Sequence, residues 1–391
     1  MGAPPACYGD GIVRPVLASA TVVASVLGLT YAACSVYGTD LLGGGNDAGT
    51  DSGTADVADA GAPGCGHAQP PSRPTTDDPG GAETQLVAAA TSVDFGLDAG
   101  ASRSFDLDDQ CTCPDKESCK PQAGAQPHCD DDAGRDNTGG PLLGKFVSLS
   151  PAFNFEGLNG RINDGANTLL FRVRHWNGLA NDTSVELAIF LSRTTAPLDD
   201  AGTHPLPKHD GNDLWSVDSA SLVGGIAPPY VPTYVDGNAY VSGGVVVGTL
   251  DFPLALGGAF SGTFISLSGA RVLGQLDKRP TGYALKDARV VGRWGTRNLL
   301  TGMQVVTDPL NQGEFLCGNN PTYQTIKSEI CKSADLTTVP QNDNSGAACD
   351  AMSLVLSFQS EPALLGPVAL DNSDAGILAP CGVSYTDQCG Q

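Results

Sequence analysis

The sequence predicts a mainly β protein: an antiparallel β-sandwich of the jelly-roll or concanavalin-like kind, with a few short helices and disulfide-stapled flanks. Three observations lead to this prediction. The chain has 50 Gly and 27 Pro among 391 residues, which favours short strands and many turns. Only seven of its 43 acidic residues are Glu, and the rest are Asp, which suits turns and caps better than helix interiors. Short apolar runs separated by turn formers recur at about the spacing of a sandwich.

The N-terminal region is predicted to be an export signal followed by a linker. An apolar run, Val16–Ala33, follows Arg14 and ends in small residues, which fits a signal peptide over residues 1–33. Tyr31-Ala32-Ala33-Cys34 resembles the bacterial lipobox, in which the cysteine is acylated, although that motif prefers Leu, Val or Ile where this chain has Tyr31. A plain secretory signal and a retained membrane anchor are the alternatives. Residues 34–82, rich in Gly, Ala, Asp, Pro and Thr, are predicted to be a flexible linker after the lipidated Cys34.

The net charge of −22 limits the partners that we expect. It repels phosphate backbones, so the sequence predicts no nucleic-acid partner, and it favours solubility and cation binding. Ser35, rather than Asp, follows Cys34. In a Gram-negative bacterium this sorts a lipoprotein to the outer membrane, so we expect an exported outer-membrane lipoprotein or cell-surface protein that contacts lipid through its acyl chains.

Residues 83–391 are predicted to form the sandwich, with an insertion at 106–137. A first strand is expected over Thr84–Phe95, and Gly140–Ser150 could be a helix or a strand. Thr168–His175 and Ser184–Ser192 alternate in hydrophobicity on either side of a turn-rich link. They are therefore expected to be an antiparallel hairpin with one strongly apolar face, which must pack on another layer.

Further strands and two helices are expected downstream. The strands are Leu214–Val223, Ala239–Leu250, Ala259–Leu267, Ala270–Leu276, Tyr283–Trp294 and Ala351–Phe358. The helices are Asn298–Met303 and Tyr323–Lys332.

The twelve cysteines indicate an oxidising compartment. None lies between Cys129 and Cys317, so the central block is expected to fold without bridges. If Cys34 carries lipid, ten cysteines remain in the mature chain, an even number that can pair completely. Bridges Cys317–Cys331 and Cys381–Cys389 are suggested by proximity in the sequence. The disulfide candidates are Cys65, Cys111, Cys113, Cys119, Cys129, Cys317, Cys331, Cys349, Cys381 and Cys389.

The segment Asp106–Asn137 combines four cysteines and nine acidic residues with almost no large apolar side chain. Bridges, a bound cation or both are expected to hold it. Alternating carboxylates around Gly134 can aim several oxygens at one point, as Ca²⁺ requires. Residues 129–137, CDDDAGRDN, resemble the Asp-rich calcium repeats of thrombospondin-type modules without their full D-x-D-x-D-G series. The predicted calcium ligands are Asp106, Asp108, Asp130, Asp132 and Asp136.

Three alternatives stay open for metal binding. The acidic segment can be a solvated turn beside two bridges. Its cysteines and His128 have passable zinc-ligand spacing, although crowded cysteines in an oxidising compartment more often pair. His204 and His209 lie in a loop with nearby aspartates and could form a separate metal site.

A glycan-binding loop is predicted at the turn of the hairpin. Trp176 offers an aromatic face for stacking, and Asn177, Asn181 and Asp182 offer hydrogen-bonding groups for sugar hydroxyls. In the alternative interpretation, Trp176 covers the edge of the core and the polar residues only build the turn.

The whole layout resembles uncharacterised cell-envelope lipoproteins of myxobacterial type. The resemblance rests on Leu27–Tyr37, the Gly- and Asp-rich linker, the Cys/Asp-rich segment and the strand Thr168–Arg174; it implies a location and no activity. We expect a tethered surface binding or structural module that is calcium-stabilised and directed at a glycan or another envelope component. The alternative is a secreted polysaccharide hydrolase with two carboxylates converging in a pocket. Catalytic motifs are absent from the sequence, so no catalytic residue is assigned.

Overall fold

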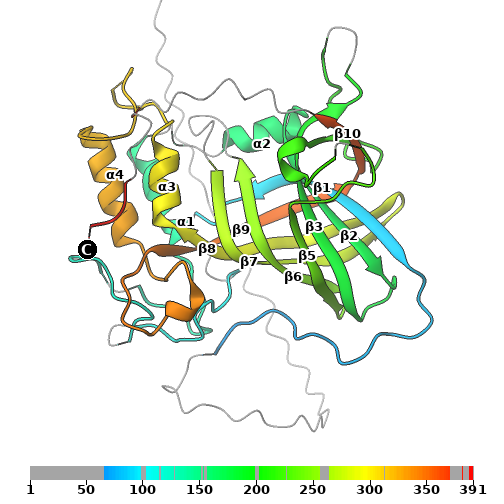
Figure 1. Cartoon of the computed structure of the whole chain (residues 1–391), viewed down its shortest axis with the longest axis horizontal. Coiled ribbons are helices and arrows are strands. Elements are labelled where there is room, and N and C mark those ends of the chain that lie inside the picture. The colour runs from blue at the N-terminus through cyan, green and yellow to red at the C-terminus, as the bar shows by residue number, and fades with distance from the viewer. Residues whose placement is uncertain are drawn as a thin grey trace, which may run out of the picture. The chain divides into compact units, whose positions relative to one another are not determined.

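Eight antiparallel strands form a closed β-barrel in the computed structural model (Figure 1). The structure describes residues 66–97, 103–113, 116–126, 128–150, 153, 156–198, 202–225, 227–255, 264–311, 313–369, 381 and 387–390. Around the barrel the strands are β1 (Thr84–Asp94), β2 (Thr168–Trp176), β3 (Asp182–Ala196), β5 (Tyr234–Ser242), β6 (Val245–Ala255), β7 (Phe264–Arg279), β8 (Gly282–Gly295) and β9 (Ala351–Pro362). β9 pairs with β1, and β5 pairs with β3 as well as β6.

The predicted open sandwich is therefore wrong, although the mainly β composition is confirmed. The reason lies in β3. Its first half pairs with β5, from Asp182 opposite Val241 to Ile189 opposite Tyr234, and this pairing closes the barrel. Alternating apolar residues look the same in a barrel wall and in one layer of a sandwich, so the sequence pattern does not distinguish the two folds.

Two further strands extend the sheet beyond the barrel. The last part of β3 pairs with β4 (Leu214–Asp218), and β10 (Leu364–Ala369) adds to β4 in parallel. Short 3₁₀ turns lie at Ser219–Ser221 and Pro340–Asn342.

The predicted hairpin of β2 and β3 is confirmed, with Thr168 opposite Ser192 and Arg174 opposite Glu186. Its apolar face does not meet a second sheet but points into the barrel. Phe171 on β2 packs edge-on against Phe358 on β9 with ring centroids 5.7 Å apart, and Phe358 also meets Phe252 on β6 at 6.0 Å. All three rings are buried, so the interior of the barrel is part of the main hydrophobic core.

Several expected strands have different limits in the structure. Leu214–Val223 is a strand only over Leu214–Asp218 and continues in the 3₁₀ turn Ser219–Ser221. Ala239–Leu250 contains the end of β5 and the start of β6, joined by Gly243 and Gly244 at φ values of 58° and 81°. A turn with two positive φ angles matches the twist of a tight hairpin and favours glycine at both positions. The separately predicted strands Ala259–Leu267 and Ala270–Leu276 share one strand, because β7 runs from Phe264 to Arg279; residues 256–263 lie outside the described residues.

In the described part of the chain, four helices accompany the barrel: α1 (Gly139–Leu149), α2 (Glu156–Asn163), α3 (Thr296–Met303) and α4 (Pro321–Lys332). Both predicted helices are confirmed, and the open choice at Gly140–Ser150 is a helix. α4 begins at Pro321, and the Asn320 side chain caps it by accepting a hydrogen bond from the Tyr323 N–H at 2.9 Å. α1, α3 and α4 lie together beside the barrel (Figure 1) and extend its core.

Disulfides fix both flanks of the barrel, as the cysteine distribution predicts. All nine described cysteines are disulfide-bonded, whereas Cys34 and Cys65 lie outside the described residues.

The predicted bridges Cys317–Cys331 and Cys381–Cys389 are wrong. α4 separates Cys317 from Cys331, and a helix rises about 1.5 Å per residue, so its two ends are too far apart for one bridge. The bridges with both partners described are Cys113–Cys129, Cys119–Cys349, Cys317–Cys381 and Cys331–Cys389.

Residues 66–82, which the sequence assigned to the flexible linker, form an extended segment that we call the N-terminal strap. Arg73 lies over the Tyr240 ring at 4.7 Å and donates to the backbone carbonyls of Thr183 and Asn238. Asp78 accepts from the Asn181 N–H at 2.8 Å. These contacts hold the strap against the barrel wall. The predicted signal peptide and the earlier part of the linker lie outside the described residues.

Asp387, near the C-terminus, is expected to stabilise the fold in a pH-dependent way. Burial raises the pKa of its carboxyl, but hydrogen bonds from Lys327 and from the Tyr323 hydroxyl (2.6 Å) outweigh this effect and lower it. A lowered pKa gives stability that is present above the unfolded-state pKa of about 3.9 and is lost as pH falls through the folded-state pKa. Asp387→Asn should therefore cost about 2 kcal/mol at pH 7 and much less at pH 3, measured by urea unfolding. An equal cost at both pH values would contradict the charged pairing.

Candidate metal centre

The acidic segment is anchored to the outside of the barrel by two apolar residues. Phe105 and Leu107 belong to a cluster with Val247 on β6 and Leu273 on β7, and with residues of β8 and β9. Arg271 on β7 donates to the Asp106 carbonyl at 3.0 Å, and Arg293 on β8 donates to the Leu107 carbonyl. The expectation that only bridges or a cation hold the segment Asp106–Asn137 is therefore wrong. Leu107 inside the segment and Phe105 directly before it both pack on the barrel.

The alternation of residues 104–108 separates the apolar anchors from the carboxylates. Asp106 and Asp108 alternate with Phe105 and Leu107, and the returning segment brings Asp136, which accepts from the Leu107 N–H at 2.7 Å. One carboxylate oxygen from each of the three aspartates lies within 4.8 Å of the others. Asp106, Asp108 and Asp136 are only 0 %, 7 % and 3 % exposed. We call this group the Asp cluster.

One oxygen of the Asp cluster has no partner. Asp108 Oδ1 accepts from the Gln110 N–H at 2.9 Å, whereas Oδ2 is buried without a hydrogen bond. The nearby Ser118 hydroxyl donates to the Asp335 carbonyl at 2.9 Å, and its proximity also lowers the pKa of Asp108, although less than burial raises it. A buried carboxylate oxygen without a partner is strongly unfavourable unless a proton or a cation occupies the position.

The electrostatics of the Asp cluster indicate missing positive charge. Burial, together with repulsion from Asp106 and Asp130, raises the pKa of Asp108 to about 7. Burial and the neighbouring aspartates also raise the pKa of Asp136 well above its ordinary value. Within the described ranges, no arginine or lysine forms an ion pair with these three carboxylates, and His67, whose pKa is raised by its hydrogen bond to Asp106, pairs with Asp106 alone. A divalent cation at this position would supply the positive charge and would bind Oδ2 as one of its ligands.

The structure brings together three of the five predicted calcium ligands. Asp130 lies beside the Asp cluster, and burial raises its pKa, but its Oδ2 accepts from the Thr112 N–H at 2.8 Å. Asp132 is exposed. The Asp cluster is the one candidate metal-binding group in the part of the chain that the structure describes, and that group does not contain His204 or His209. The zinc alternative is wrong because the cysteines of this segment are disulfide-bonded.

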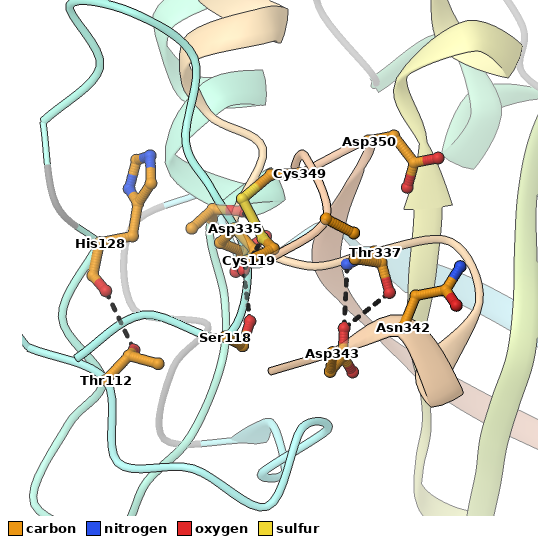
Figure 2. Close-up of a disulfide and its surroundings, with 12 residues drawn as sticks. Thr112, Ser118, Cys119, His128, Asp335, Thr337, Asn342, Asp343, Cys349 and Asp350 are labelled. Atoms are coloured by element: carbon orange, nitrogen blue, oxygen red, sulfur yellow. Dashed lines mark hydrogen bonds between the residues drawn. A yellow bond between two sulfur atoms is a disulfide. The ribbon is translucent and has the colours of Figure 1, made fainter. Parts of the chain in front are cut away.

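Figure 2 shows how the acidic segment is tied to the chain between α4 and β9. Cys119 and Cys349 form a bridge whose Cα atoms lie 5.1 Å apart, and Ser118 contacts the backbone of Asp335 beside it. This bridge joins positions 230 residues apart. The bridge fixes a segment of little regular structure against the core. The spacing of the cysteines alone does not predict this pairing.

A pocket of about 430 Å³ opens next to this region, with Asp130, His128 and Asp335 in its wall together with Leu142 and Lys145 of α1. Asp335 already accepts hydrogen bonds from the Thr138 hydroxyl at 2.9 Å and the Ser353 hydroxyl at 2.6 Å. Because both of its oxygens are used in this way, Asp335 is a poor candidate for one of the two carboxylates of a hydrolase. The hydrolase alternative gains no support from this pocket.

The predicted glycan-binding residues are used within the fold. Trp176 is 3 % exposed, its ring meets Tyr283 edge-on at 5.0 Å, and its indole N–H donates to the Leu179 carbonyl at 2.8 Å. Asn177 donates its backbone N–H to Asp182 at 2.7 Å, and Asn181 bonds Asp78 of the N-terminal strap. In this conformation the indole presents no open face to a sugar, so glycan binding here stays a prediction without structural support.

His67 is the main residue of the site that the sequence interpretation missed. Its Nδ1 contacts Asp106 Oδ2, yet it is 39 positions away in a stretch that reads as linker. By contrast, the alternation of Ser104, Phe105, Asp106 and Leu107 is a visible signal for an anchored extended segment.

Comparison of the chain with protein-family models, curated proteins and solved structures finds no match. Over the residues that the structure describes, no helix has the length and apolar character needed to cross a membrane.

Proposed function

We propose that the protein is an exported, lipid-tethered cell-envelope module whose barrel carries a structural calcium site formed by Asp106, Asp108 and Asp136. The ion would join residues 106–108, which lie on the barrel wall, to the returning segment around Asp136. It would thereby stabilise a surface loop region that has few regular backbone hydrogen bonds. The module then serves binding or architecture at the cell surface, as the sequence layout suggests.

The observation that carries this proposal is the buried, unpaired Oδ2 of Asp108, in a group of three buried aspartates that each have a carboxylate oxygen within 4.8 Å of the others. Ca²⁺ binds six to eight oxygens and combines carboxylates with carbonyls and water in flexible geometry. Mg²⁺ requires a stricter octahedron and loses water reluctantly. A cluster of three carboxylates on two irregular segments therefore suits Ca²⁺ better.

The export part of the proposal is supported by the bonding of all nine described cysteines, since disulfides persist in oxidising compartments. Mass spectrometry of the native protein tests it. We expect a mature N-terminus at Cys34 with acyl chains attached, and loss of membrane association in Cys34→Ser. A native protein that keeps residues 1–33 and has free thiols at the bridged positions would contradict this part.

Calcium is expected to stabilise the purified protein against heat. If Kd is about 10 µM, 1 mM Ca²⁺ adds about 2.7 kcal/mol, which corresponds to a rise in Tm of about 5 °C for a chain of this size. Calorimetric titration after removal of bound metal with a chelator measures Kd directly, and Mg²⁺ at the same concentration should give a smaller shift. An unchanged Tm and no heat of binding would contradict the calcium site.

Asp108→Asn should abolish the calcium-dependent rise in Tm, because it removes one ligand charge and places an amide in the cluster. The variant should still fold without calcium, since it relieves repulsion among buried carboxylates. Asp132→Asn is the matched control: it removes an exposed, predicted ligand outside the Asp cluster and should keep the full effect. Equal loss in both variants would mean that calcium acts through net charge and not at this site.

A further inference from the structure

The first residues of the N-terminal strap lie between the two segments that supply the Asp cluster. The Gly66 N–H donates to the Asp132 carbonyl and the Ala68 N–H to the Ala133 carbonyl, both at 2.8 Å. The Asp106 N–H in turn donates to the Ala68 carbonyl at 2.9 Å. The strap therefore joins the segment around Asp106 to the segment that leads to Asp136.

His67 connects the strap to the carboxylates themselves. Its Nδ1 contacts Asp106 Oδ2, and it can donate a proton to this oxygen in the tautomer that carries hydrogen on Nδ1. Asp106 is fully buried, whereas the His67 side chain is 49 % exposed. Gln69 adds a hydrogen bond from its amide to the Asp106 carbonyl at 3.1 Å. The strap thus fixes both the backbone and the carboxylate of Asp106.

We propose that His67 is a positioning residue for the calcium site, and that ion binding and docking of the strap stabilise each other. This inference rests on the proposed calcium site and adds to it a residue, His67, and a coupled element. Hydrogen bonds to a metal-ligating carboxylate set its orientation, and loss of such an outer partner typically weakens metal binding about 10- to 100-fold. His67 occupies this position toward Asp106.

The coupling follows from shared contacts. The ion and residues 66–69 would both hold the segments around Asp106 and Asp136 in one arrangement, so each would lower the cost of ordering those segments for the other. Coupling between two binding events is reciprocal. Calcium should therefore increase the equilibrium constant for docking of residues 66–69 by the same factor by which docking increases calcium affinity.

The strap has a second attachment that provides a control. Arg73 lies over Tyr240 and donates to the backbone carbonyls of Thr183 and Asn238, none of which belongs to the Asp cluster. Because this attachment is six residues from His67 along the chain, it can be weakened without removing a group that touches Asp106.

The test compares calcium affinity in four full-length proteins by calorimetric titration. We expect His67→Ala to raise Kd at least 10-fold, His67→Asn to recover part of the loss through its side-chain N–H donor, and Arg73→Ala to change Kd less than threefold. Unfolding without calcium, measured by circular dichroism, confirms that each variant is folded. This readout separates a positioning role from simple loss of structure.

Hydrogen exchange of the Gly66 and Ala68 amides supplies the second readout. In the wild type, calcium should slow their exchange about 10-fold, and in His67→Ala it should have little effect. If the wild type binds no calcium, both the proposed function and the coupling fail. If it binds calcium but His67→Ala has the same Kd, and the strap exchanges equally with and without the ion, the coupling alone is overturned.

Discussion

Replacing Cys119 and Cys349 together by alanine is expected to lower the free energy of unfolding by about 5 kcal/mol. The bridge joins positions 230 residues apart, and the entropy that a cross-link removes from the unfolded chain grows with the length of the closed loop. It also attaches the acidic segment to the chain before β9, so calcium binding should weaken in the same variant. Guanidinium unfolding under non-reducing conditions measures the first effect, and calorimetric titration measures the second.

The Cys113–Cys129 bridge, with a sequence separation of 16, is the matched control. Its loop is short, so removing it should cost about 3 kcal/mol by the same chain-entropy argument. The two pairs differ in loop length and also in burial, because Cys119 is buried and Cys349 half-buried whereas Cys113 and Cys129 are exposed. An equal loss in the two double variants would show that loop closure is not the main contribution of the Cys119–Cys349 bridge.

Phe358→Ala is expected to cost about 4 kcal/mol, because it removes a fully packed ring from the interior of the barrel. Phe358 on β9 contacts Phe171 on β2 and Phe252 on β6, two strands that do not pair with each other. Contact with both requires that the sheet closes around a common interior. The change in urea midpoint, with an unchanged slope, measures the loss.

Two comparisons make the Phe358 experiment specific. Phe358→Leu should recover most of the stability, since it keeps the site apolar and much of its volume. Phe315→Ala, at a ring that is 38 % exposed, should cost less than about 1 kcal/mol. Similar losses at Phe358 and Phe315 would contradict a filled barrel interior.

Strand positions were largely predictable from the sequence, whereas the closure of the barrel was not. The alternation in β2 and β3 identifies the hairpin and even its core face, because Leu169 and Val185 must share an environment. The pairing of β3 with β5 leaves no comparable signal. It depends on where the long strand β3 changes partner between Ile189 and Ser192, and this is decided by the fit of whole strands around the barrel.

The candidate site was predictable in part for similar reasons. Regular spacing of carboxylates indicates a cation site, and Asp106, Asp108 and Asp136 do converge. Spacing does not reveal which carboxylates are drawn inward, and here Asp132 is left at the surface while Asp106 is placed by the anchors on either side of it. Likewise, His67 reaches the cluster only because the strap returns along the barrel, a path set by contacts such as that of Arg73 with Tyr240.

The pairing of β1 with β9 has a consequence for how the chain acquires its structure. Asp94 lies opposite Ser357, so β1, the earliest of the described strands to be synthesised, has one edge unpaired until β9 has also been made. Until then, a curved sheet with two unpaired edges is exposed to association with other chains. We expect slow folding, in line with contacts between such distant residues, and a need for chaperones that shield nascent strands during biogenesis.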